Sequence, residues 1–157
     1  MRKPNLLILA AWIVHVASWF LPVTKVPDLN APVPGWKAFR LAACGVWPCE
    51  GIQFQSILHK VLATTSVMTT LFFILCSLFI LCSPWVVLRG SAKGLRFAAS
   101  AAAAAFIFNI HWIVIFASVG AKLTIGYFLW WFSFLLLAIG LFRLPEIKKR
   151  ELLPSRA

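Results

Sequence analysis

Four long apolar runs, separated by shorter polar segments, dominate the chain. They predict helices over about residues 5–22, 58–83, 97–118 and 124–143. Each run approaches the roughly 20 apolar residues that a helix needs to cross a bilayer, and none alternates with period two as the strands of a membrane barrel do. Because backbone polar groups in lipid must be satisfied within their own segment, we predict an all-α, four-helix membrane bundle that forms one domain.

Composition agrees with this pattern. Hydrophobic residues make up 62% of the chain and charged residues 12%, and the mean hydropathy is +0.91. Soluble domains contain about 25% charged residues. We therefore expect a protein embedded in the lipid bilayer, with its polar connections outside the hydrocarbon.

The distribution of the net charge of +11 predicts an orientation. Ten of the 15 Lys and Arg residues lie near one set of predicted helix ends, which includes both termini, and five lie near the other set. Under the positive-inside rule, the termini and the basic tail 144–157 are cytoplasmic and the loop 23–57 is extracytoplasmic. The small size and short loops suit a bacterial inner membrane. Because no cation lies in a soluble domain, nucleic acid is not an expected partner.

The first apolar run also fits a cleaved signal peptide. Basic residues precede it, and small residues at 16–18 resemble a cleavage site. Trp12, His15 and Trp19 are unusual in such a segment, so we favour a retained helix. Cleavage would leave three helices and would not move any later loop to the other side.

The predicted loop 23–57 is rich in proline at its start, which favours an extended connection with little regular structure. After Gly35, the segment 36–43 has apolar residues on one side and Lys37 on the other. This pattern predicts a short amphipathic helix at the level of the lipid headgroups. We expect it to dock on the bundle, and a partner-binding element is the alternative.

Cys44 and Cys49 lie in this loop, on the side of the membrane where disulfides form and persist. A bridge between them closes a small ring and stabilises the fold by roughly 2 kcal/mol before any strain. We predict a structural disulfide. Cys76 and Cys82 are about 9 Å apart along one predicted helix and cannot bridge each other.

This plan is similar to that of the DsbB-type thiol oxidases, which also have four helices and cysteines in the first outer loop. The resemblance would imply quinone-linked oxidation of thiols. The chain departs from that family's pattern, because the spacing is Cys-x4-Cys instead of Cys-x-x-Cys and the second outer connection, at 119–123, has no cysteine. Without a second pair, electrons lack an intramolecular relay.

His15 and His111 lie at similar predicted depth in the outer half of the bundle. Two such imidazoles could ligate a b-type haem from opposite sides, or bind a quinone or quinol. The simpler and favoured interpretation is a buried polar site in which the imidazoles, and Asn109, make ordinary hydrogen bonds. His59 begins the second helix on the same side. We expect no metal site, because the predicted spans contain no carboxylate.

Small residues form two stripes that favour close helix packing. The first stripe, on the predicted helix 124–143, consists of Gly126, Ser133 and Gly140. The second stripe, on the predicted helix 97–118, consists of Ala98, Ala102 and Ala105 and is followed by Asn109. In lipid, such stripes let helix backbones approach each other. They serve either the internal packing of the bundle or a lateral contact with another membrane protein or a second copy of the chain.

Motifs for catalysis are missing from the sequence, and its four acidic residues lie outside the predicted spans. The sequence therefore favours a small non-enzymatic accessory protein that acts through lateral helix packing, with no catalytic residues. The alternatives are a redox subunit holding haem or quinol near His15 and His111, a thiol oxidase and a small transporter.

Overall fold

The computed structural model describes residues 3–25, 31–47, 49–50, 54, 56–82, 92–118 and 120–152. Most of these residues are helical. The helices are α1 (Lys3–Phe20), α2 (Gly35–Ala43), α3 (Ile57–Cys82), α5 (Ala92–Phe108), α6 (His111–Ser118) and α7 (Ile125–Leu152).

Three helical segments are long and apolar enough to cross a membrane. They are Ile57–Cys82, Ala92–Ser118 and Ile125–Pro145, and each contains a stretch of 18 residues whose mean hydropathy is 2.2, 1.8 and 2.0, respectively. The apolar part of α1, Leu6–Phe20, is shorter. The helical class and the membrane-length helices are confirmed, and they make a multi-pass membrane protein plausible.

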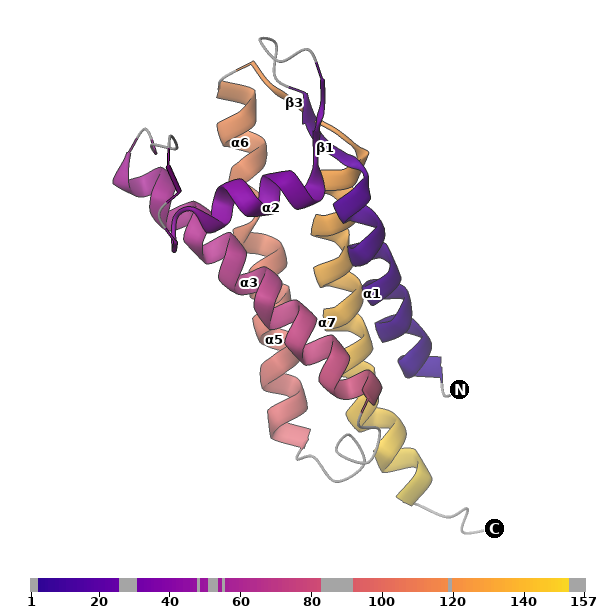
Figure 1. Cartoon of the computed structure of the whole chain (residues 1–157). Helices are drawn as coiled ribbons and strands as arrows, with labels where there is room; N and C mark the ends of the chain where they lie inside the picture. Colours follow the sequence, from indigo (N-terminus) through magenta and orange to yellow (C-terminus); the bar gives the residue numbers. More distant parts are fainter. Residues whose placement is uncertain are drawn as a thin grey trace.

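Both chain ends lie at one end of the molecule, and α2 lies across the bundle near the opposite end (Figure 1). Helix α6 and the three short strands are also at that opposite end, which we call the α2 end. Helix α7 is central, because it packs along both α1 and α5. The elements at the α2 end therefore cover one end of a bundle whose other end carries the termini.

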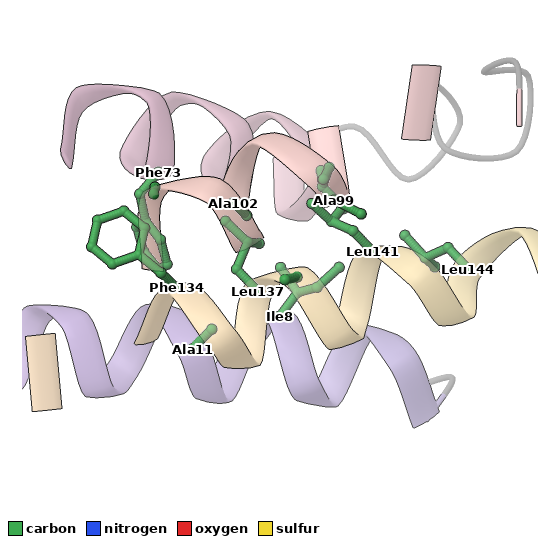
Figure 2. Packing of buried hydrophobic residues seen from close by; sticks show 12 residues of the cluster. Ile8, Ala11, Phe73, Ala99, Ala102, Phe134, Leu137, Leu141 and Leu144 are labelled. Carbon is green, nitrogen blue, oxygen red and sulfur yellow. The ribbon is translucent and has the colours of Figure 1, made fainter. Parts of the chain in front are cut away.

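Alternating small and large side chains form the core between these helices (Figure 2). Ala99 and Ala102 on α5 are fully buried and bring its backbone close to Leu137 and Leu141 of α7. On the other side of α7, Ala11 has the same role in α1. Because lipid gives little hydrophobic drive for helix association, this close contact between helices is what holds the bundle together.

Helix α1 ends at Phe20 instead of residue 22, because Pro22 begins strand β1 (Pro22–Lys25). Strand β1 pairs antiparallel with β2 (Val33–Pro34) and with β3 (Lys122–Leu123), in the order β2-β1-β3. The prediction of little regular structure in this loop was wrong on this point. The short sheet joins the two connections at the α2 end, which are about 100 residues apart in sequence.

The predicted helix 97–118 begins five residues earlier, at Ala92, and is interrupted at Asn109 and Ile110. The amides of Ile110, Trp112 and Ile113 bond three residues back, as in a tighter helix. The Asn109 carbonyl accepts a hydrogen bond from the Tyr127 hydroxyl at 2.6 Å, and the Asn109 side chain donates to Ala105 O at 2.8 Å. Side chains that compete for backbone carbonyls explain the interruption.

The other two predicted helices agree with the structure at one end or both. The second matches α3 within one residue at each end, since 58–83 was predicted and Ile57–Cys82 is helical. Helix α7 begins at Ile125 but continues through Pro145 to Leu152, so the prediction of an end at 143 was wrong. Strong helix formers after Pro145 favour this extension. Residues 83–91, which include the predicted end of the second helix at 83, lie outside the described part.

Candidate functional site

A cavity of about 510 Å³ lies at the α2 end, among α2, α3, α6, the start of α7 and the short sheet. Its walls are mainly apolar. Ala42 of α2, Ala63 and Val67 of α3, and Ile115 and Phe116 of α6 are among the lining residues. Binding sites for small molecules usually measure about 300–1,000 Å³ and have largely apolar walls. We call this space the α2 cavity.

Helix α2 is fixed over the cavity at its first residue. The Gly35 amide donates to Leu21 O at 3.0 Å, and a Cβ at Gly35 would collide with Ser18 O and lie 2.8 Å from Trp19 Cα. Only glycine lets α2 start this close to the end of α1. One turn later, the Phe39 ring stacks on Trp19 with 5.2 Å between ring centroids. Helix α2 is therefore held against α1 by close backbone contact and by stacked rings.

The far end of α2 is fixed by the predicted cysteine pair. The sulfur atoms of Cys44 and Cys49 lie 2.03 Å apart, at disulfide distance, and the two Cα atoms are 5.3 Å apart. Cys44 is the buried residue that directly follows α2. Next to it, a Cβ at Gly45 would lie 2.8 Å from Thr64 Oγ1 of α3. The cysteine pair thus closes a small ring of residues at the point where α2 meets α3.

Polar side chains beside the cavity bond to one another. Ser66 Oγ donates to Asn109 Oδ1 and accepts from Trp112 Nε1, both at 2.8 Å. Thr70 Oγ1 accepts from Trp130 Nε1 at 3.2 Å. Asn109, predicted as a polar anchor, is fully buried at the centre of this network. Because these groups satisfy each other, the cavity that they border stays largely apolar.

His15 is buried in α1 and bonds to the predicted small-residue stripe. Its Nδ1 lies 2.9 Å from Ser133 Oγ, and Ser133 donates its single hydroxyl hydrogen to Trp130 O at 2.6 Å. The His15 Nδ1 therefore carries a hydrogen and donates. The ring also stacks on Phe73, with 4.1 Å between centroids. Within the described residues, Nε2 has no hydrogen-bond partner.

His111 adopts the same tautomer. Its Nδ1 lies 2.7 Å from Phe108 O, and a carbonyl only accepts, so Nδ1 donates. Its Nε2 is also buried without a partner among the described residues. The described α2 cavity is lined by His59 but by neither His15 nor His111, and a separate groove of about 180 Å³ between α1 and α3 is lined by His15 alone of the three. Neither of these two cavities thus brings His15 and His111 together around one ligand.

The first small-residue stripe faces α1. A Cβ at Gly126 would lie 2.5 Å from Pro22 O and 2.8 Å from Leu21 O, and one at Gly140 would lie 2.9 Å from Ile8 Cγ1. Ser133 is fully buried between them. In the second stripe, Ala102 and Ala105 belong to the core.

Ala98 is half-buried and packs against that core. Both stripes therefore serve contacts within this chain. The described ranges, with their gaps at 26–30 and 83–91 among others, contain no group of three or more His, Cys, Asp or Glu placed to hold a metal ion.

Sequence reasoning missed the α2 cavity, although two signals pointed to it. Ala38 and Ala42 place small side chains on the face of α2 that lines the cavity, and a larger residue there would fill it. Gly35 marks the point where α2 is pressed against α1. No known protein family and no curated protein matches the sequence, and no solved structure matches the fold.

Proposed function

We propose that α1 crosses the membrane together with the three membrane-length segments, so that the protein has four spans and both termini in the cytoplasm of a bacterial cell. An α-helix of 18 residues is about 27 Å long, close to the roughly 30 Å of the hydrocarbon layer. The two chain ends lie at the same end of the bundle (Figure 1), as an even number of spans requires. The excess of cations near the termini supports the same orientation.

Thiol labelling in intact cells tests this orientation. A membrane-impermeant maleimide should leave all four cysteines unlabelled at first, because Cys44 and Cys49 are paired and the exposed Cys82 is cytoplasmic. After an impermeant reductant, Cys44 and Cys49 should react, and Cys82 should react only after cell lysis. Labelling of Cys82 in intact cells would contradict the orientation, and labelling of Cys44 without reductant would contradict the disulfide.

The function that the geometry supports best is non-enzymatic binding of an amphiphile, whose apolar tail occupies the α2 cavity. The cavity is the observation that carries this proposal. Its volume of about 510 Å³ and its apolar walls suit a hydrocarbon chain. At the proposed depth, near the outer headgroups, a lipid could leave the bilayer laterally and keep its polar part in water.

A lateral partner is a separate proposal. The stripes that favoured it face this chain's own helices, so a neighbouring protein or a second copy would have to use other surfaces. Exposed apolar side chains on α3, such as Leu75 and Phe79, are in contact with lipid in the proposed bundle. Co-purification after extraction in a mild detergent tests whether another protein accompanies the chain.

Filling the cavity tests the binding function. Ala42→Trp places an indole in the α2 cavity, whereas Ala104→Trp adds the same group to an exposed position of α5. Native mass spectrometry of protein extracted in mild detergent should show bound lipid for the wild type and for Ala104→Trp. We expect Ala42→Trp to reduce the lipid-bound fraction at least about tenfold, since a blocked pocket loses its apolar contacts.

Circular dichroism shows whether Ala42→Trp keeps its helices, and Ala38→Trp, on the same wall of the cavity, provides a second test. Equal lipid occupancy in folded Ala42→Trp and Ala104→Trp proteins would reject the cavity as the binding site.

A further inference from the structure

Five Lys and Arg residues lie at the end of the bundle that holds the α2 cavity. Each of the five Lys and Arg residues at the α2 end is the immediate neighbour in sequence of a residue that lines the cavity. The pairs, with the lining residue second, are Lys25 and Thr24, Lys37 and Ala38, Arg40 and Phe39, Lys60 and His59, and Lys122 and Leu123. Consecutive Cα atoms are 3.8 Å apart, so the backbone of each of these five residues lies close to the lining of the cavity.

These cations are available to a ligand. All five are exposed, and none forms an ion pair with a residue that the structure describes. Glu50 is the only acidic residue described at this end, and it is exposed as well. The described part of the α2 end therefore carries five positive charges and one negative charge around an apolar space.

We propose that the α2 cavity binds an anionic phospholipid, with an acyl chain inside it and the phosphate among these cations. This proposal rests on the proposed function and adds the class of the ligand. A zwitterionic lipid would gain less than an anionic one from these cations, because its own ammonium group offsets its phosphate, and a cationic amphiphile would be repelled by them. An anionic phospholipid places its phosphate near the cations at the headgroup level, while the apolar walls accept its acyl chain.

Competition between lipids tests the proposal on the full-length protein. In native mass spectrometry, phosphatidylglycerol and phosphatidylcholine with identical acyl chains are offered at equal concentration. We expect phosphatidylglycerol to bind at least about twentyfold more tightly, since each nearby cation contributes about fivefold to the affinity for an anionic lipid and two cations alone give about this factor.

The double variant Lys37→Gln and Arg40→Gln should weaken phosphatidylglycerol binding roughly twentyfold and phosphatidylcholine binding much less. Its matched control is Lys93→Gln with Arg96→Gln, which removes two exposed cations from α5 near the opposite end of the bundle. We expect this control variant to leave the binding of both lipids unchanged.

The outcomes separate the two proposals. If both lipids bind equally and both are lost in Ala42→Trp, the proposal of an anionic ligand is wrong, whereas the proposed binding of an amphiphile in the cavity is supported. Equal weakening by the two double variants would also overturn the proposal of an anionic ligand, because overall charge would then explain the preference. Phosphatidylglycerol binding that is unaffected by Ala42→Trp would overturn the cavity function itself.

Discussion

Replacing Gly126 by alanine is expected to lower the free energy of unfolding by about 2 kcal/mol, the cost typical of overpacking. The new Cβ would lie 2.5 Å from Pro22 O and 2.8 Å from Leu21 O. These atoms belong to the backbone of Leu21, which follows α1, and of Pro22, which begins β1, so they cannot turn away as a side chain can. Helix α7 would have to move from the end of α1, although alanine is the better helix former.

Gly140→Ala is the matched control on the same helix. There the closest atom to a new Cβ is Ile8 Cγ1 at 2.9 Å, which belongs to a side chain and not to the backbone, so we expect a smaller cost than at Gly126. The gain in helix propensity, up to about 1 kcal/mol, opposes that cost. Denaturant titration in mixed micelles, followed by circular dichroism, measures both variants. Equal stability of the two would show that α7 does not pack on Pro22 as described.

Asn109→Leu is expected to lower the free energy of unfolding by about 2 kcal/mol, because leucine has the same number and branching of side-chain heavy atoms but no hydrogen-bonding group. Asn109 accepts from Ser66 at 2.8 Å and donates to Ala105 O at 2.8 Å and to Thr69 Oγ1 at 3.3 Å. Side-chain hydrogen bonds within membrane proteins average about 0.6 kcal/mol each. Losing three of them, and leaving Ser66 with one partner fewer inside the bundle, gives the expected total.

Thr65→Val is the control for Asn109→Leu, and the same titration measures it. The Thr65 hydroxyl donates to Val61 O at 2.9 Å within its own helix, so its loss breaks no contact between helices. We expect a change below about 0.5 kcal/mol. If Asn109→Leu costs no more than Thr65→Val, the polar network does not join α3 to α5.

The sequence predicted what depends on local composition. Apolar runs longer than any turn predicted the helical class, and the bounds of α3 were accurate to one residue because Gln55 and Ser56 precede it and Pro84 follows it in the sequence. The short spacing of Cys44 and Cys49 allowed the pair that the structure places at disulfide distance. Small residues at helical spacing indicated the faces that pack, although not which helix each face would meet.

Features that depend on distant contacts were not predictable in this way. The short sheet pairs Thr24 with Leu123, and neither segment has a strand pattern of its own. The interruption at Asn109 depends on Tyr127, which lies 18 residues away on another helix. The α2 cavity depends on how α2 is placed across the bundle, and an amphipathic pattern alone does not specify that placement.

Photolabelling by a lipid tests the central claim, that the α2 cavity holds a hydrocarbon chain, most directly. Phosphatidylglycerol with a photoreactive diazirine near the end of one acyl chain is incorporated into membranes that contain the protein, and labelled residues are identified by mass spectrometry. Labels on cavity residues such as Val67 and Ile115, lost in Ala42→Trp, are the predicted result. Labels confined to outward-facing residues such as Leu75 and Phe79, unchanged by Ala42→Trp, would contradict it.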